Sequence, residues 1–167
     1  FGVTRFAGRA YYQGAYSTDN DNHYEFFSAS GLDFVVIHLE DAIPQPASVL
    51  DWADRILKAN PARRGIVVSH EVASAGNPAA FSSQGQAIYD SLKDNPNFFL
   101  MLGGQNAEAG RRTDTYYGSV VHTIVANYQF RANGGDGYMR LLKFSPSANE
   151  IQVKTYSPAL PAFDTGP

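Results

Sequence analysis

The sequence predicts an α/β protein of the α+β kind, in which layers of mixed β-sheet are flanked by helices. Two patterns support this expectation. Apolar runs typical of buried strands alternate with helix-like patterns over residues 33–103, whereas residues 118–156 show strand-like segments separated only by turns. The first pattern is typical of parallel strands and the second of antiparallel pairing, so we expect the sheet to be mixed.

The amino-terminal third is expected to supply three strands before the first helix. Residues 9–16 and 22–29 are rich in aromatic side chains and roughly alternate between apolar and polar residues. The Ser-Thr-Asp-Asn-Asp segment between them consists of residues that favour turns. Residues 33–39 form a nearly continuous apolar run, as expected for a strand that is buried on both faces.

Two helices are expected, over residues 46–60 and 84–93, and an Asn-Pro pair ends each of them. The first helix shows the clearer pattern, because its apolar side chains recur with the period of 3.6 residues that places them on one face. These side chains are Val49, Leu50, Ala53, Ile56 and Leu57.

Further strands are predicted on both sides of the second helix. The segments 65–69 and 97–102 are short apolar runs that fit buried strands. After residue 110 no helical pattern recurs, and the segments 118–127, 137–144 and 150–156 are predicted as strands.

The glycine-rich segment 133–137 is the one place that invites comparison with a phosphate loop or a calcium-binding turn. It lacks the Lys-Ser/Thr pair of the former and the spaced carboxylates of the latter, so we interpret it as a hairpin turn. We expect residues 1–158 to form a single domain and residues 159–167 to be a tail or linker.

Composition excludes several classes of function. A net charge of −3 and a pI near 5.7 provide no basic surface for nucleic acid or for an anionic membrane. The chain has no cysteine, so disulfides, thiolate nucleophiles and thiolate metal sites are impossible. Its apolar runs are too short to cross a bilayer. The chain does not begin with methionine, and we expect it to be processed or to be part of something longer.

Polar residues follow two of the predicted buried strands, where an open α/β sheet places its ligands. His70 and Glu71 come directly after one strand, and Gln105, Asn106 and Glu108 come shortly after the next. An imidazole is a common metal ligand and general base, so these residues could line one crevice. The alternative remains open, because a single histidine at a strand end is often only a hydrogen-bonded structural residue.

The other histidines give weaker indications. His38 alternates within an apolar strand, so we interpret it as a core residue rather than a ligand. Glu40 and Asp41 follow that strand and either reach the crevice or belong to a solvated loop. His122 lies within a predicted strand, and His23, in a strand flanked by turns, is expected at the surface.

Several stretches resemble a group of bacterial calcineurin-like metallophosphoesterases. They are residues 34–70 (FVVIHLED to GIVVSHE), 85–104 (GQAIYDSLKDNPNFFLMLGG), 110–129 (GRRTDTYYGSVVHTIVANYQ) and 134–158 (GGDGYMRLLKFSPSANEIQVKTYSP). The start of the chain is also similar to the part that follows the first motifs of that family. The likeness implies the carboxy-terminal half of an αββα sandwich.

The same resemblance implies a site for two divalent metal ions, either Zn, Mn or Fe, whose ligands come from five motifs. The first three motifs precede the segment that this chain matches. Ser69-His70 matches the fourth, so His70 is the metal ligand that the resemblance implies. The fifth, Gly-His-x-His, falls on residues 104–107, where Gln105 and Ala107 replace both histidines.

The sequence therefore leaves two functions open. One is a metallophosphoesterase-like hydrolase domain that is incomplete or inactive in this chain and whose substrate is a phosphoester. The other is a non-catalytic binding module that recognises a glycan or protein partner through exposed tyrosines. A half-sandwich would expose an apolar sheet face, so we expect a homo-oligomer or the missing amino-terminal half as partner. The composition and the resemblance also suggest a secreted or extracellular protein.

Overall fold

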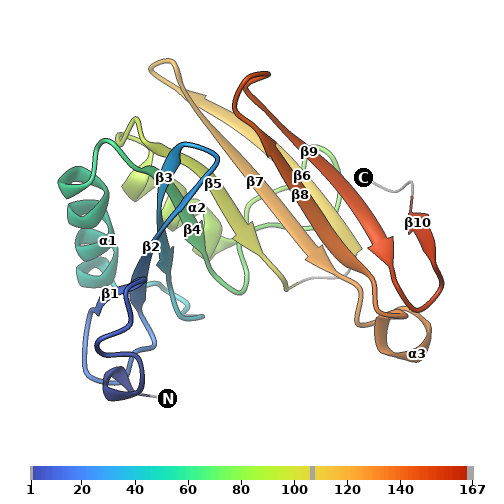
Figure 1. Cartoon of the computed structure of the whole chain (residues 1–167), viewed down its shortest axis with the longest axis horizontal. Coiled ribbons are helices and arrows are strands. Elements are labelled where there is room, and N and C mark those ends of the chain that lie inside the picture. Colours follow the sequence, from blue (N-terminus) through green and yellow to red (C-terminus); the bar gives the residue numbers. More distant parts are fainter. Residues whose placement is uncertain (1, 106–107, 165–167) are drawn as a thin grey trace.

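The computed structural model describes residues 2–105 and 108–164 (Figure 1). Strands form two sheets, one of seven strands and one of three, and helices flank the larger sheet. The predicted fold class, with mixed sheet layers flanked by helices, is confirmed. No helix in the described part combines the length and the apolar character needed to cross a membrane.

The seven-stranded sheet is mixed, with the strand order β1-β2-β3-β4-β5-β7-β6. Neighbours among β3, β4, β5 and β7 pair in parallel, whereas β1, β2 and β6 pair antiparallel with the strands beside them. In chain order these strands are β1 Tyr12–Ala15, β2 His23–Ala29, β3 Leu32–His38, β4 Arg64–Val68, β5 Phe98–Gly103, β6 Glu108–Tyr116 and β7 Ser119–Asn127.

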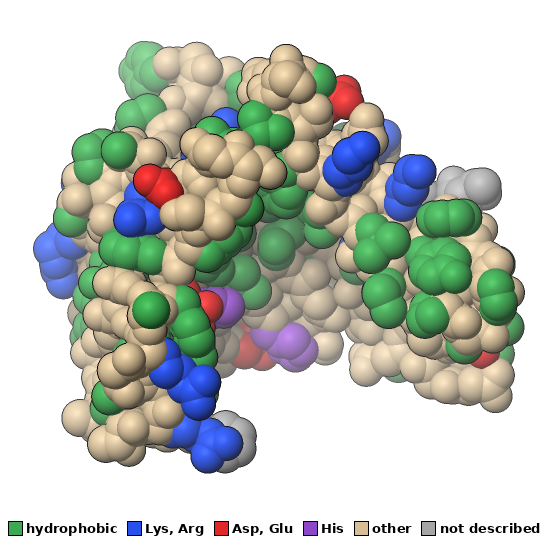
Figure 2. Space-filling view, viewed as in Figure 1, with side chains coloured by type: hydrophobic (Ala, Val, Ile, Leu, Met, Phe, Trp, Pro, Cys, Tyr) green, Lys and Arg blue, Asp and Glu red, His purple; other side chains and the backbone are tan. Residues whose placement is uncertain are grey.

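The smaller sheet has the order β10-β9-β8 and lies over part of one face of the larger sheet (Figure 1). Leu142, Phe144 and Ile151 from β8 and β9 pack against the buried side chains of that face. The cover is incomplete, and Figure 2 shows a hollow at the middle of the molecule with histidine and acidic side chains at its lower side. The strands of this sheet are β8 Met139–Ser145, β9 Glu150–Ser157 and β10 Ala162–Asp164.

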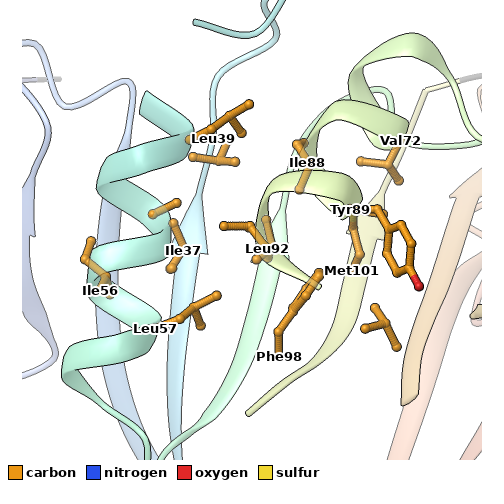
Figure 3. Close-up of a cluster of buried hydrophobic side chains, with 14 of the residues drawn as sticks. Ile37, Leu39, Ile56, Leu57, Val72, Ile88, Tyr89, Leu92, Phe98 and Met101 are labelled. Carbon is orange, nitrogen blue, oxygen red and sulfur yellow. The ribbon is translucent and has the colours of Figure 1, made fainter. Parts of the chain in front are cut away.

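The helices α1 (Ala47–Ala59) and α2 (Ser83–Leu92) cover the opposite face of the larger sheet (Figure 3). All five apolar residues that the periodicity assigned to the inner face of the first helix are buried. On the sheet side they meet side chains such as Ile37, Val67 and Met101, each with no exposed surface. A fully buried side chain of this size contributes about 1.5–3 kcal/mol, so this layer adds substantially to the stability of the fold.

Strand β6 has no counterpart among the predicted elements, although the other strands of the larger sheet do. Its central residues, Arg-Arg-Thr-Asp-Thr, are polar, because β6 is an edge strand that pairs on one side only, with β7. Edge strands commonly carry charged side chains, and such a segment shows no apolar alternation to read.

The prediction of a hairpin turn at 133–137 is wrong. The strands before and after this segment belong to different sheets, because β7 pairs with β5 and β6 while β8 pairs with β9. The segment instead includes a single helical turn, α3 (Ala132–Gly135), in which Asn133 and Gly134 have positive φ. Turn-forming residues therefore marked a crossing between sheets, which local sequence does not distinguish from a hairpin.

The segment that follows residue 158 contains β10, which pairs antiparallel with β9. At the amino-terminal end of the described chain, a short 3-10 helix, η1 (Val3–Arg5), precedes the first strand. The sequence had suggested no partner for residues 159–167, and the described part of this tail contributes a strand to the smaller sheet. The boundaries of the predicted domain stay a prediction.

Candidate functional site

The carboxyl ends of the parallel strands β3, β4 and β5 lie at one edge of the larger sheet, and His70 lies just beyond β4. The backbone N–H groups of Gly104 and Gln105, just beyond β5, both donate hydrogen bonds to the carbonyl oxygen of His70, at 3.0 and 2.9 Å. The two loops are therefore held side by side by backbone contacts, whatever their side chains do.

The ring of His70 is oriented by an acidic neighbour. Its Nδ1 lies 3.1 Å from Oδ2 of Asp41, which follows β3. An ionised carboxylate only accepts hydrogen bonds, so in the neutral imidazole the proton is on Nδ1 and the lone pair is on Nε2. A carboxylate in this position is a common partner of a metal-binding histidine. Both side chains are about half exposed, at 52% and 45%.

A buried hydrogen-bond network supports the backbone on which His70 lies. The hydroxyl of Ser69 donates to the carbonyl oxygen of Leu39 at 3.0 Å. The amide of Gln84, in the first turn of α2 and only 1% exposed, donates to the Ser69 hydroxyl at 2.8 Å and to the Glu40 carbonyl at 2.9 Å. These contacts fix the ends of β3 and β4 relative to α2, since buried polar groups require their partners.

The remaining residues of the predicted crevice lie in different settings. Glu108, at the start of β6, forms a salt bridge with Arg131 at 2.6 Å. The carbonyl of Glu71 accepts a hydrogen bond from the Ser82 hydroxyl at 2.8 Å. Asn106 lies outside the described residues. Of the candidate residues, the structure thus places Gln105 directly beside His70 through its backbone.

A second group of potential ligands lies on β2 and β3, where the sequence predicted no site. The antiparallel register places His23 directly opposite His38, and the two rings stack with centroids 4.4 Å apart and planes 10° apart. Glu25, two residues from His23 and on the same face, has Oε1 3.9 Å from His23 Nε2. One ligand atom from each residue lies within 4.8 Å of the others.

The electrostatics of this group favour uncharged imidazole. Burial, with a smaller contribution from the neighbouring His23, lowers the pKa of His38 to about 4. His38 is therefore neutral at neutral pH. Sequence analysis interpreted His38 as a core residue and His23 as a surface one. A two-residue turn at Ser30-Gly31, with the second strand starting at Leu32, would have placed the two histidines opposite each other, which is the signal that was missed.

A pocket of about 300 Å³ lies between the two sheets, lined by residues that include Arg64, Phe99, His122 and Phe144. The Arg64 guanidinium lies over the ring of Phe99, 4.1 Å from its centroid. The Nδ1 of His122 lies 3.0 Å from the Thr113 hydroxyl, and burial, followed by the charge of Arg64, lowers the pKa of His122. This pocket is separate from the carboxyl-end edge at His70.

The geometry defines a layered α/β protein with a polar edge at the carboxyl ends of its parallel strands. No family model matches the chain. The uncharacterized protein YvnB of Bacillus subtilis (strain 168) is 32% identical over 167 residues, which cover 95% of this chain and 12% of that protein. The chain thus spans about an eighth of the length of this relative.

A comparison with solved structures gives a weak match. It is a candidate 5′-nucleotidase from Staphylococcus aureus, in complex with α-ketoglutarate. It is 14% identical to this chain with a TM-score of 0.46, and the match covers 86% of this chain and 30% of that one. A likeness of this degree carries no conclusion about the chemistry of this chain.

Proposed function

We propose that this chain is the carboxy-terminal part of a phosphoesterase-like hydrolase domain, and that its own residues are insufficient for turnover. The observation that carries the proposal is the setting of His70. It lies at the carboxyl ends of parallel strands, Asp41 orients its ring, and its Nε2 lone pair is left to bind a ligand. The sequence resemblance assigns a metal-ligating role to this same histidine.

The donor set argues against a complete dinuclear site. Two divalent ions need several imidazole or carboxylate ligands that converge from different strands. Around His70, the structure supplies one imidazole, and the Asp41 carboxylate is engaged with Nδ1 of that imidazole. Gln105 has a neutral amide, which is a weak ligand for zinc, iron or manganese. These residues do not fit two ions, so the missing ligands must come from elsewhere, and the chain alone holds at most one position of such a site.

What this chain can do at the site is therefore limited and specific. His70 presents one nitrogen ligand, and Asp41 keeps the proton on the other nitrogen. The buried hydrogen bonds of Ser69 and Gln84 hold the loop that carries His70 in position. A divalent metal bound there would supply Lewis-acid activation of a phosphoester, and the ligands beyond His70 would decide whether it acts.

A second function, a non-catalytic binding module, is favoured by one observation. Tyr117, in the turn between β6 and β7, is 93% exposed and makes an edge contact with Tyr116. Exposed tyrosines are common in surfaces that bind proteins or sugars. Lys93 lies over the Tyr116 ring, 5.0 Å from its centroid, and adds a donor beside this aromatic pair.

The test compares this chain with the longest natural polypeptide that contains it, using p-nitrophenyl phosphate with added Mn²⁺ or Zn²⁺. We expect turnover only by the longer polypeptide. In that polypeptide, His70→Ala should reduce turnover at least about 100-fold, while His122→Ala should leave it within about threefold. Turnover by this chain alone, or full activity of the longer polypeptide with His70→Ala, would contradict the proposal. Absence of turnover in both would favour the binding module.

A further inference from the structure

We propose that His23, Glu25 and His38 form a binding site for one divalent transition-metal ion of the zinc class, separate from the edge that carries His70. The three residues come from the antiparallel pair β2–β3, and their side chains share the face of the larger sheet that the helices do not cover. Two strands therefore supply all three ligands, so the site requires nothing beyond the described chain.

The hydrogen bond made by Nδ1 of His23 leaves its Nε2 available to bind a metal ion. Its Nδ1 lies 3.0 Å from the carbonyl oxygen of Asn20. A carbonyl oxygen only accepts, so the proton is on Nδ1, and in the neutral ring Nε2 carries the lone pair. This Nε2 is the atom that faces Glu25, at 3.9 Å from Oε1. A ligating histidine commonly donates its other N–H to a backbone carbonyl in this way.

The support for His23 extends one residue further. Asn20 is buried and has φ of 76°, a left-handed conformation that asparagine tolerates better than most residues. Its side-chain oxygen accepts a hydrogen bond from the Tyr12 hydroxyl at 2.6 Å. Tyr12 and Asn20 therefore hold the carbonyl that orients His23, which is the kind of outer support that a metal site requires.

The second imidazole is available for coordination. No hydrogen bond to the ring of His38 is found in residues 2–105 and 108–164, so neither of its ring nitrogens is engaged with a protein group there. Glu25 supplies the negative charge that partly neutralises the ion.

Binding requires a small rearrangement. A tetrahedral ion with ligands at about 2.0–2.2 Å needs its ligand atoms about 3.4 Å apart. The three atoms lie within 4.8 Å of one another, so they must approach by roughly an ångström. The rings are nearly parallel, and an ion lies in the plane of each ring it binds, so one ring must turn. His38 is that ring, since Asn20 holds His23.

The ligand set selects the class of ion. Two imidazoles and one carboxylate suit Zn²⁺, Co²⁺, Ni²⁺ and Cu²⁺, whereas Mg²⁺ and Ca²⁺ prefer sites composed of oxygen ligands. Three protein ligands leave a fourth tetrahedral position for water. We therefore expect the site to bind Co²⁺ and Zn²⁺ in competition with each other and to be indifferent to a large excess of Mg²⁺.

The experiment uses the chain without a polyhistidine tag, stripped of metal with EDTA and dialysed. Co²⁺ is titrated while its visible absorption is recorded, Zn²⁺ is then added as competitor, and bound metal is counted by elemental analysis. We expect one equivalent of Co²⁺, displaced by Zn²⁺. His23→Gln and His38→Gln should weaken binding by about 100-fold or more, and Glu25→Gln by about 10–100-fold.

Two matched variants separate this site from other histidines. His70→Gln removes the ligand of the proposed phosphoesterase edge, and His122→Gln removes a half-buried histidine of the same sheet; both should bind within about threefold of the parent chain. Far-UV circular dichroism and urea midpoints confirm that each variant is folded. Glu25→Gln keeps the inference testable if the histidine variants fail to fold, because Glu25 is a partly exposed residue and the change preserves its shape.

The possible outcomes are distinct. Stoichiometric binding that is weakened by changes at His23, His38 or Glu25 supports the inference, whatever the fate of phosphoester turnover. No Co²⁺ binding at micromolar concentration overturns it. So does binding that persists in His38→Gln and is lost in His70→Gln, a result that would place the ion at the proposed phosphoesterase edge.

Discussion

The two faces of the seven-stranded sheet differ in how they are covered and in the residues they carry. Helices α1 and α2 close one face over side chains such as Val35, Ile37 and Met101, which have no exposed surface. The smaller sheet covers only part of the other face, where two valines remain half-buried: Val36, on the same strand as His38, and Val68, on the neighbouring strand β4. Titratable side chains lie on the less completely covered face.

The physical reason is the cost of burying polar groups. An imidazole or guanidinium that is removed from water without a partner destabilises the fold by several kcal/mol, so a fully closed layer excludes it. Arg64 and His122 are tolerated on the other face because a pocket admits solvent and because Phe99 and Thr113 contact them. A face with partial cover can therefore hold both a core and candidate ligands.

The sharpest test of this contrast uses two neighbouring residues of β5. Phe98 faces the helices and is 0% exposed, whereas Phe99 faces the smaller sheet and is 6% exposed. We expect Phe98→Ala to lower the free energy of unfolding by about 3–5 kcal/mol and Phe99→Ala by about 2–3 kcal/mol, because the pocket beside Phe99 already reduces its contacts. Urea denaturation followed by circular dichroism measures both.

If Phe98→Ala does not fold, Phe98→Leu serves instead, with an expected loss below about 1.5 kcal/mol. A loss for Phe99→Ala that equals or exceeds the loss for Phe98→Ala would show that the smaller sheet closes its face as completely as the helices close theirs.

Low pH should reduce the free energy of unfolding because of His38, which lies on the less completely covered face. With EDTA present, an unfolded histidine takes up a proton near pH 6.5, but in the folded chain the pKa of His38 is about 4. The unfolded state thus binds more protons between these values, and stability falls as the pH falls. From pH 7 to pH 5 we expect a loss of at most about 2 kcal/mol, measured by urea midpoints.

His38→Gln should remove most of this dependence, whereas His70→Gln should retain it, because that change leaves His38 in place. An unchanged pH dependence in His38→Gln would show that other groups are responsible for the acid sensitivity.

The smallest expected effect concerns the polar end of the helix-covered face. Ser82 caps α2, because its hydroxyl accepts from the Gly85 N–H at 3.0 Å and donates to the Glu71 carbonyl at 2.8 Å. Ser82→Ala should cost about 1 kcal/mol in thermal or urea unfolding. Ser83→Ala, at an exposed neighbouring position, should stay within about 0.5 kcal/mol. Equal losses in the two variants would argue against a capping role.

The expected oligomer stays a prediction. The smaller sheet reduces the apolar area that a bare half-sandwich would expose, but Phe27 on the same face is still 43% exposed. Its ring stacks on Phe34, 4.6 Å between centroids, which fixes an aromatic surface near the edge of the sheet. Light scattering at micromolar concentration distinguishes a monomer from a homo-oligomer.

The sequence by itself determined the elements whose patterns are strong. The first helix, the apolar strands and the mixed character of the sheet follow from local periodicity, because burial on one face or on both leaves a direct pattern in the residues. The position of His70 just beyond a parallel strand could likewise be predicted, since the apolar run before it is visible in the sequence, whereas its role as a metal ligand stays a prediction.

Only the tertiary structure decided the features that depend on pairing across the chain. The polar edge strand β6, the crossing to the smaller sheet at α3 and the apposition of His23 with His38 all depend on which strands become neighbours. The register of β2 against β3 stacks the rings of His23 and His38, which are 15 positions apart in the sequence. A register shift of one residue would have placed the two rings on opposite faces of the sheet. Pairing is a long-range property, and a single local pattern does not specify it.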